Sequence, residues 1–373
     1  MSIRVLHMAD AHLGASLTNF GTYAERRRAE QEAAFQRAIG VALAERVHVV
    51  LIAGDLFDTY RPDPHTVNLA RRELTRLKEA GIKALAVPGT HDSLSYAGSV
   101  YRRESLPFHH FFVEPTFAEP ITLEIEGVKV SIYGIAYDRE GSKGGWSTLE
   151  RRHPDGIHIA LAHAACRFNP QWPIAPDDLP FLEEDLGRLG MNYVALGHYH
   201  NRRLFHAGGR VVGAYSGSLE ARDWTEPGER HVLLVEWEAA GAPPAVQAIA
   251  VQTRMVDSVA VDVSGLSEAD DLVRMVAAAC PPESLWRVTL TGEPEVVPDP
   301  QAIASELEPT HGHVLVSDET TLVTSHRIRE RCEEETVRGE FFRRLVDQRA
   351  NAVDDRGRAV ADRAIKLGLR VFG

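Results

Sequence analysis

Five short apolar segments of this sequence are each followed directly by a cluster of Asp, His or Gly residues. The clusters are Asp10-Ala11-His12, Gly54-Asp55, Gly89-Thr90-His91-Asp92, His163 and Gly197-His198-Tyr199-His200. The apolar segments have the length of buried strands, and longer amphipathic stretches alternate with the first of them. This alternation is typical of βα units in a layered α/β domain, where polar residues at the carboxyl ends of strands meet in one crevice.

The segments between these clusters have the spacing of ordinary strands and helices. Strands are predicted over residues 3–8, 49–53, 82–87, 128–133, 158–162, 193–196 and 232–237. Residues 25–45 and 66–80 have apolar side chains at helical intervals, and Gly81 is placed to end the second helix. We therefore expect the clusters to lie far apart in sequence and close together in space.

Composition distinguishes three parts of the chain. We predict a first domain over residues 1–240, because the glycine and proline residues of 239–244 are typical of a linker. A small α/β module over 241–325 follows, with alternating strand-like and helix-like segments and no obvious chemistry. The last part, 326–373, is charged and poor in strand signals, and its apolar side chains at helical spacing predict two amphipathic helices.

Length, composition and charge exclude several classes of protein. The 373 residues are 44% hydrophobic and 25% charged, which predicts a globular protein of more than one domain. No apolar run reaches the roughly 20 residues of a membrane span, so we expect a cytoplasmic protein without a membrane partner. The three cysteines are far apart, which argues against a disulfide framework or a zinc knuckle. The net charge of -12 argues against a uniformly basic nucleic-acid surface.

The residue types in the clusters point to metal chemistry. Carboxylates and imidazoles together suit manganese, iron or zinc, and the absence of thiolates from the clusters disfavours a structural zinc site. A carboxylate between two ions about 4 Å apart is the arrangement that clamps a phosphate. Each cluster alone is weak evidence, because a lone Asp or His after a strand is more often a helix cap or a buried polar group. Five clusters in this order leave that alternative little room.

The order of the clusters, D-x-H, G-D-x-x-D, G-x-H-D, H and G-H-x-H, resembles the calcineurin-like metallophosphoesterase superfamily. Within it, the chain is most similar to the SbcD-like DNA repair exonucleases, the nuclease subunits of SbcCD-type complexes. The segments that carry this likeness are Asp10-Ala11-His12-Leu13-Gly14, Gly54-Asp55-Leu56-Phe57-Asp58 and Tyr215-Ser216-Gly217-Ser218, the last followed by Glu220. The resemblance implies an α/β fold: a layered metallophosphoesterase β-sandwich flanked by helices, with a small α/β capping domain and a C-terminal helical tail.

The resemblance also implies roles for individual residues. Two divalent metal ions are expected, with manganese favoured and iron or zinc as alternatives. The implied ligands are Asp10, His12 and His200 for one ion, Asp55 between the two, and His163 and His198 for the other. His91 is expected to face the phosphodiester, with Asp92 holding its imidazole in orientation. Asp58 is expected behind the ligands.

One residue departs from the family pattern. The usual motif is G-N-H-D, in which the Asn oxygen binds the second metal, and this sequence has Thr90 at that position. The threonine hydroxyl is shorter and a poorer neutral ligand. It could coordinate directly, position a water, or leave the second site weak. We expect weaker binding at the second site, with activity retained at high metal concentration.

The expected function is metal-dependent cleavage of phosphodiesters in DNA. The resemblance implies a 3′-5′ exonuclease with single-strand endonuclease activity in double-strand-break repair. Arg102, Arg103, Arg202 and Arg203 are candidate phosphate contacts, although arginine pairs also decorate solvated helix faces. The alternatives are a small-molecule or nucleotide phosphoesterase on the same metal site, or a non-catalytic assembly subunit.

The partners that the resemblance implies are DNA and an SbcC-like ABC-type ATPase. The ATPase would dock on the helical tail over 326–373, and two copies of the chain would form a homodimer. From the residues alone, the tail helices could equally pack on their own domain. The protein would be associated with the nucleoid when bound to DNA.

Overall fold

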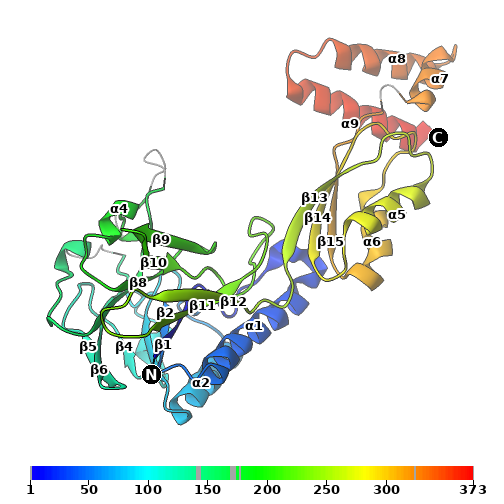
Figure 1. The fold of residues 1–373 in the computed structure, drawn as a ribbon. Helices are drawn as coiled ribbons and strands as arrows, with labels where there is room; N and C mark the ends of the chain where they lie inside the picture. Colours follow the sequence, from blue (N-terminus) through cyan, green and yellow to red (C-terminus); the bar gives the residue numbers. More distant parts are fainter. Residues whose placement is uncertain (1, 140–143, 169–173, 176–177, 323–324, 373) are drawn as a thin grey trace. The chain divides into compact units, whose positions relative to one another are not determined.

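The computed structural model describes residues 2–139, 144–168, 174–175, 178–322 and 325–372. The chain divides into two compact units, Met1–Met255 and Val256–Gly373. The first unit contains two sheets and the second unit one (Figure 1). Each unit has its own buried apolar side chains. The five clusters that follow the predicted strands all belong to the first unit.

The first unit contains two six-stranded sheets of mixed direction. The first sheet has the order β12-β11-β1-β2-β3-β4, and its strands β1 to β4 are parallel. Their bounds are β1 Ile3–Met8, β2 Val49–Ala53, β3 Lys83–Val87, β4 His110–Phe111, β11 His231–Trp237 and β12 Ala245–Ala250. Parallel neighbours end at the same edge of a sheet, so the residues after β1, β2 and β3 are brought together.

The second sheet has the order β5-β6-β7-β8-β10-β9. Strands β6, β7, β8 and β10 are parallel, and β5 and β9 close the two edges in antiparallel pairing. Their bounds are β5 Ile121–Ile125, β6 Val128–Ile135, β7 Ile157–His163, β8 Tyr193–Gly197, β9 Arg203–Ala207 and β10 Arg210–Tyr215. One buried cluster combines Val5 and Leu51 of the first sheet with Ile132, Ile159 and Tyr193 of the second. The two sheets therefore form a sandwich, as expected.

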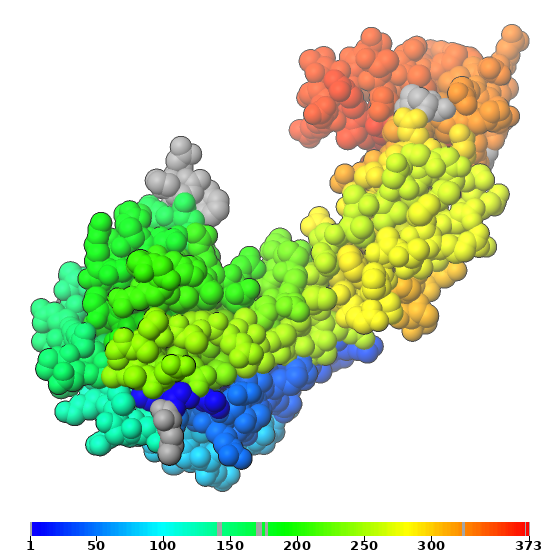
Figure 2. Space-filling model, viewed as in Figure 1, coloured from blue at the N-terminus to red at the C-terminus, as the bar shows by residue number. Residues whose placement is uncertain are grey.

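Two long helices cover the outer face of the first sheet. Helix α1 spans Ala24–Ala44 and helix α2 spans Pro64–Glu79, and their side chains form the blue surface in Figure 2. Asp63 caps α2 by accepting the main-chain N–H groups of His65 and Thr66, and Pro64 suits the first helical position. Burying one Leu or Phe of these faces contributes about 1.5–3 kcal/mol.

Short elements complete the first unit. They are the 3-10 segments η1 Thr18–Tyr23 and η2 Gly145–Thr148 and the helices α3 Val100–Arg103 and α4 Glu183–Leu186. Arg27 of α1 is fully buried, and its Nη1 lies 2.8 Å from Glu220 and 3.0 Å from Glu30. The same guanidinium donates to the carbonyl of Ala221 at 3.0 Å. Arg27 is thus a structural residue that ties α1 to the segment after β10.

The segment 239–244 forms the turn between β11 and β12. Because β12 pairs along its whole length with β11, residues 245–250 belong to the sheet of the first unit. Glycine and proline are common both in hairpin turns and in linkers between domains. The composition of residues 239–244 alone therefore does not distinguish a turn from a linker.

The second unit begins with a three-stranded parallel sheet of order β13-β14-β15. Helices α5 and α6 connect its strands and share a buried cluster with them that includes Val276, Ile303 and Val288. The bounds are β13 Val256–Asp262, α5 Ala269–Ala279, β14 Leu285–Thr291, α6 Pro300–His311 and β15 Val314–Asp318. Helix α6, which the sequence pattern did not predict, begins with Asp299 as its cap and Pro300 at its first position.

Three helices follow where two were predicted: α7 His326–Glu333, α8 Val337–Ala350 and α9 Asp355–Phe372. Helix α7 buries only Ile328, so it has no apolar period that sequence reading could detect. Phe342 of α8 and Ile365 and Leu369 of α9 pack with Ile328 in one buried cluster. Among the described residues, no helix is both long enough and apolar enough to cross a membrane.

Candidate metal centre

The candidate site lies where five strands of the first unit end. Asp10 and His12 follow β1, Asp55 follows β2, residues 89–92 follow β3, His163 ends β7, and His198 and His200 follow β8. Eight described non-glycine residues have positive φ, and four of them are site residues. They are Asp10 at 51°, His12 at 46°, Asp55 at 48° and His198 at 110°. Such conformations cost about 1–3 kcal/mol each and concentrate at functional sites.

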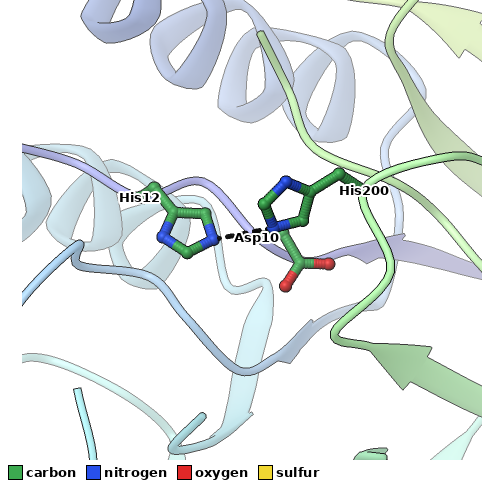
Figure 3. Close-up of side chains that lie close together, drawn as sticks. All are labelled: Asp10, His12 and His200. Carbon is green, nitrogen blue, oxygen red and sulfur yellow. Dashed lines mark hydrogen bonds between the residues drawn. The ribbon is translucent and has the colours of Figure 1, made fainter. Parts of the chain in front are cut away.

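A first cluster consists of Asp10, His12 and His200, whose potential ligand atoms all lie within 4.8 Å of one another. The two imidazoles face each other, with Nε2 of His12 3.1 Å from Nε2 of His200, and the carboxylate of Asp10 lies beside them (Figure 3). Burial lowers the pKa of His12 to about 4, so its ring is held neutral. A neutral imidazole has a free lone pair, which metal binding requires.

Glu226 holds the ring of His200. Its Oε1 lies 2.6 Å from Nδ1 of His200, and its Oε2 accepts the Ser218 hydroxyl at 3.2 Å and the main-chain N–H of Arg222 at 3.1 Å. Burial opposes the charge of Glu226, but its bonds with His200 and Arg222 lower its pKa to about 2. With the Nδ1 proton directed at this carboxylate, Nε2 of His200 is left as the ligand atom.

A second cluster consists of Asp10, Asp55 and His163, all buried. Nδ1 of His163 lies 2.9 Å from the carbonyl of Ala53, and its Nε2 lies 3.3 Å from Oδ2 of Asp55. Burial disfavours a charge on His163, yet the carboxylates of Asp55 and Asp10 raise its pKa to about 10. The buried carboxylates of this cluster therefore favour a cation at this point, whether a proton or a metal ion.

The turn after β3 wraps around the carboxylate of Asp55. The main-chain N–H of His91 donates to Oδ1 at 2.8 Å, and the hydroxyl of Thr90 donates to Oδ2 at 3.1 Å. A Cβ added at Gly89 would clash with Oδ1 of Asp55, so only glycine permits this approach. Thr90 thus lies at the second cluster, at the position where the family motif has Asn.

His198 lies at the edge of the second cluster. Its ring centroid is 5.2 Å from that of His163, and burial lowers its pKa to about 3. Its main-chain N–H lies 3.1 Å from both carboxylate oxygens of Asp10. Among the described residues, no group of three potential ligand atoms within 4.8 Å includes His198.

His91 and Asp58 meet beside the first cluster. Nδ1 of His91 lies 3.0 Å from the main-chain carbonyl of Asp58, and His91 is exposed, so its Nε2 is free to face solvent or substrate. Oδ1 of Asp58 lies 3.2 Å from Nδ1 of His12. His12, Asp58 and His91 form a third group of atoms within 4.8 Å.

The expected role of Asp92 needs correction. Among the described residues its carboxylate makes no hydrogen bond with the ring of His91. It accepts the main-chain N–H groups of Gly89 at 2.8 Å and Phe57 at 3.1 Å. The hydroxyl of Tyr101 donates to it at 2.7 Å. Burial and the nearby charge of Asp55 raise the pKa of Asp92 to about 6. Asp92 therefore shapes the turn that carries His91, because main-chain donors surround it.

Arg222 is a further site residue that the sequence pattern did not indicate. Its Nη2 donates to Oδ1 of Asp58 at 2.7 Å, and its Nη1 lies 3.3 Å from Nε2 of His12. Arg222 and Glu226 lie in an irregular segment after β10, where no periodicity marks functional positions. In the sequence, these two residues are marked only by their charge and by their position shortly after residues 215–218.

Two of the predicted arginine contacts lie on α3. Nε of Arg102 donates to the carbonyl of Leu94 at 2.8 Å, while Arg103 lines a pocket with Tyr60 and Arg61. Helix α3 also carries Tyr101, so it is fixed to the turn after β3 by the bond to Asp92.

The other two predicted contacts lie after β8. Arg202 is exposed two residues after His200. Nη2 of Arg203 donates to Glu183 at 2.8 Å, and its guanidinium lies 4.2 Å from the ring centroid of Phe168. Because Arg203 already makes these contacts within its own domain, it is a weaker candidate than Arg202 for binding a phosphate.

The donor set fits divalent metal ions. Nδ1 of His12 and Nε2 of His163 are buried and make no hydrogen bond among the described residues. A carboxylate oxygen lies close to each, Oδ1 of Asp58 at 3.2 Å and Oδ2 of Asp55 at 3.3 Å. Ligands of a first-row metal lie about 2.0–2.2 Å from the ion, which places two of them roughly 3.4 Å apart at a tetrahedral angle. The separations of 3.1 Å in the first cluster and 3.3 Å in the second match that spacing. The arrangement is consistent with a dinuclear site.

Comparisons with known proteins agree with this geometry. Residues 3–202 match the family model described as calcineurin-like phosphoesterase. The DNA double-strand break repair protein Mre11 of Sulfurisphaera tokodaii is 30% identical over 278 residues, 71% of this chain and 67% of that protein. A subunit of the nuclease SbcCD of Bacillus subtilis is 26% identical, over 61% of this chain and 64% of that protein. The uncharacterized metallophosphoesterase YhaO of Bacillus subtilis is 28% identical, over 62% and 56%.

Proposed function

Because this chain belongs to the calcineurin-like phosphoesterase family, we propose that it is a metal-dependent phosphodiesterase that acts on DNA. The observation that carries the proposal is the meeting of Asp10, Asp55 and the site histidines at the ends of five strands. The DNA substrate is supported by two relatives, which are named as a double-strand break repair protein and as part of a nuclease. This chain covers 67% and 64% of their lengths, respectively.

The proposed metal ligands fall into two sets. Asp10, His12 and His200 would hold one ion, and His163 and His198 would hold the other, with Asp55 shared. Thr90 would leave the second set one strong ligand short. The ions, when bound, supply Lewis-acid charge stabilisation and lower the pKa of water. Manganese is the expected metal, with iron and zinc as alternatives of similar ligand preference.

Two other residues are proposed to act on the phosphodiester itself. His91 would direct its Nε2 at the leaving oxygen, because its Nδ1 is engaged by the carbonyl of Asp58. Arg222, which donates to Oδ1 of Asp58 at 2.7 Å, would bind a non-bridging phosphate oxygen. Its guanidinium is fixed by the bond to that carboxylate, so little side-chain freedom is lost on binding.

The helical tail is the proposed docking site for an ATPase partner. Helix α9 buries Ile365 and Leu369, but exposes 57% of Val360, 52% of Leu367 and 74% of Val371. These exposed apolar side chains recur at helical spacing, which suits a partner groove. The relative named as a subunit of SbcCD supports a complex of several chains. A homodimer is proposed on the same likeness.

A small-molecule phosphoesterase is the second candidate function. It is favoured by the common use of this type of metal site for many substrates, because fold does not determine substrate. A second unit with an exposed apolar helix face has no evident use in a small-molecule enzyme, which favours DNA.

Cleavage of DNA tests the proposal. The purified chain is incubated with manganese and end-labelled linear duplex or single-stranded DNA, beside His91→Ala. We expect metal-dependent products for wild type and at least about a hundredfold less for the variant. Cleavage of a p-nitrophenyl phosphate ester without cleavage of DNA would favour the small-molecule enzyme, and two bound metals without either activity would overturn the proposal.

A further inference from the structure

A pocket lined by arginines is formed by residues that follow Asp58 and the turn after β3 in the chain. It has a volume of about 280 Å³ and is lined by Tyr60, Arg61, Gly98 and Arg103, among others. Its walls come from the segment after β2, from the first turns of α2, and from α3 with the residues on either side of it. We propose that this pocket binds a backbone phosphate of a nucleic-acid strand of which another phosphodiester, no more than about three nucleotides away, lies in the metal centre. This inference rests on the proposed function and names the polymer as its substrate class.

The charge of the pocket favours a phosphate. Arg61 and Arg103 have no carboxylate within 4.0 Å among the residues that the structure describes, so both guanidinium groups are available. Arg71, on the same wall, is already paired with Glu104 at 2.8 Å. Two unpaired guanidinium groups in one small pocket repel each other, and an anion between them removes that repulsion.

The position of Arg61 is set by its neighbours. A Cβ added at Gly98 would clash with Nε and Nη2 of Arg61, so the guanidinium lies against the main chain at Gly98. The same guanidinium lies 5.6 Å from the ring centroid of Tyr60. Tyr60 in turn stacks on Tyr96, with centroids 4.2 Å apart and ring planes 14° from parallel. The cation is therefore held in place before a ligand binds, which lowers the entropic cost of binding.

The pocket is joined to the catalytic residues by short connections. Arg61 follows Asp58 by three residues, so their Cα atoms lie within roughly 10 Å. The main-chain N–H of Val100 donates to the carbonyl of Tyr60 at 2.8 Å, and the next residue, Tyr101, bonds Asp92. One nucleic-acid strand rises about 3.4 Å per nucleotide in a duplex, so it covers this span in about three nucleotides.

Four variants separate the pocket from the metal centre. Arg61→Gln and Arg103→Gln remove the charges singly and together. Gly98→Ala keeps both charges and displaces the Arg61 guanidinium, at a position without a positive φ. The control is Arg210→Gln, an exposed arginine at the start of β10, which lies at the opposite end of the strands from His200.

Binding of a labelled single-stranded oligonucleotide to the metal-free chain is measured by fluorescence anisotropy over a range of salt concentrations. Turnover of the oligonucleotide and of bis(p-nitrophenyl) phosphate is measured with manganese. We expect the double variant to bind the oligonucleotide about tenfold more weakly, with a salt slope reduced by about 0.7 per lost contact. Its KM for the oligonucleotide should rise, its kcat should stay unchanged, and the small ester should be hydrolysed as by wild type.

Each outcome bears on the pocket. Unchanged affinity in the double variant, or equal loss in Arg210→Gln, would overturn it, as would equal loss of turnover on the small ester. A smaller loss in Gly98→Ala than in Arg61→Gln supports it. The two proposals can fail separately. If wild type hydrolyses neither substrate, but the double variant binds the oligonucleotide more weakly than wild type does, the proposed function fails and the pocket is retained.

Discussion

The two candidate metal-binding clusters differ in which groups lie against their histidine rings. In the first cluster, carboxylates lie against the rings: Glu226 lies 2.6 Å from Nδ1 of His200, and Asp58 lies 3.2 Å from Nδ1 of His12. In the second cluster, a main-chain group lies against the ring: the carbonyl of Ala53 lies 2.9 Å from Nδ1 of His163. An ionised partner makes an imidazole a stronger ligand than a neutral carbonyl does. The first cluster should therefore bind its ion more tightly.

The second cluster would also lack one strong ligand of the family pattern. Thr90 stands where the family motif has Asn, and its hydroxyl donates to Asp55. A hydroxyl that donates to a carboxylate directs its proton, not a lone pair, along that direction. We therefore expect the two sites of the centre to differ in metal affinity. Four substitutions test this expectation.

The largest effect is expected at Asp55, the residue proposed to be shared by the two ions, whose Oδ2 lies 3.3 Å from Nε2 of His163 and 3.7 Å from Nε2 of His12. Asp55→Asn keeps the shape of the side chain but removes the charge that two ions would share. Because a two-metal clamp supplies several kcal/mol of transition-state stabilisation, we expect kcat/KM for bis(p-nitrophenyl) phosphate to fall by about 10³ or more.

The control for this loss is Asp63→Asn, because asparagine and aspartate cap a helix about equally well and Asp63 caps α2. A loss of less than about tenfold in Asp55→Asn would mean that the two halves do not share this residue.

Glu226→Gln should weaken the first cluster selectively. The amide cannot carry the charge that favours the ligand form of His200, so affinity for the tighter ion should fall by about 10–100-fold. Metal titration of the variant measures this change. Glu229→Gln is the matched control, because Glu229 lies three residues away and contacts His231 instead. An unchanged tight site would show that Glu226 only packs against the ring.

Thr90→Asn should make the two sites more alike. An amide oxygen at this position adds a neutral ligand, and we expect affinity for the weaker ion to rise by about tenfold. Thr90→Val, which removes the hydroxyl at nearly constant shape, should bring no gain. Equal, tight binding of two ions in wild type and Thr90→Asn would contradict the inequality of the sites.

The smallest effect is expected at Tyr101, which acts on the turn through Asp92. Tyr101→Phe removes one buried hydrogen bond, but Asp92 keeps its two main-chain donors. The free energy of unfolding of the metal-free protein, measured in urea, should fall by about 1 kcal/mol. A change in kcat of more than about tenfold would show instead that the main chain alone does not hold the second half of the centre.

Much of this molecule could be predicted from its sequence. The strands that carry the site are short apolar runs with Asp, His or Gly at their ends, and the structure places β1, β2, β3, β7 and β8 there. The clusters could be assigned to one crevice because parallel strands end at one edge. Elements with weaker sequence signals were not predicted. Strands β9 and β10 form a hairpin at the edge of a sheet, and α7 buries a single apolar side chain.

The supporting residues could not be predicted in the same way. Glu226 and Arg222 lie in an irregular segment, and only the folded chain shows that they contact His200 and Asp58. The carbonyl of Ala53 cannot be recognised in any sequence, because every residue has one. The role of Asp92 was misassigned for a related reason: its partners are main-chain N–H groups. Sequence therefore indicates which side chains could bind metal better than it indicates what holds them.

The inequality of the two sites is tested most directly by a manganese titration of the metal-free wild-type chain, with free Mn²⁺ followed by electron paramagnetic resonance. We expect two ions per chain, bound in two separate steps, with the tighter step weakened in Glu226→Gln and the weaker step strengthened in Thr90→Asn. Two equal sites, or a single ion that neither substitution affects, would contradict it.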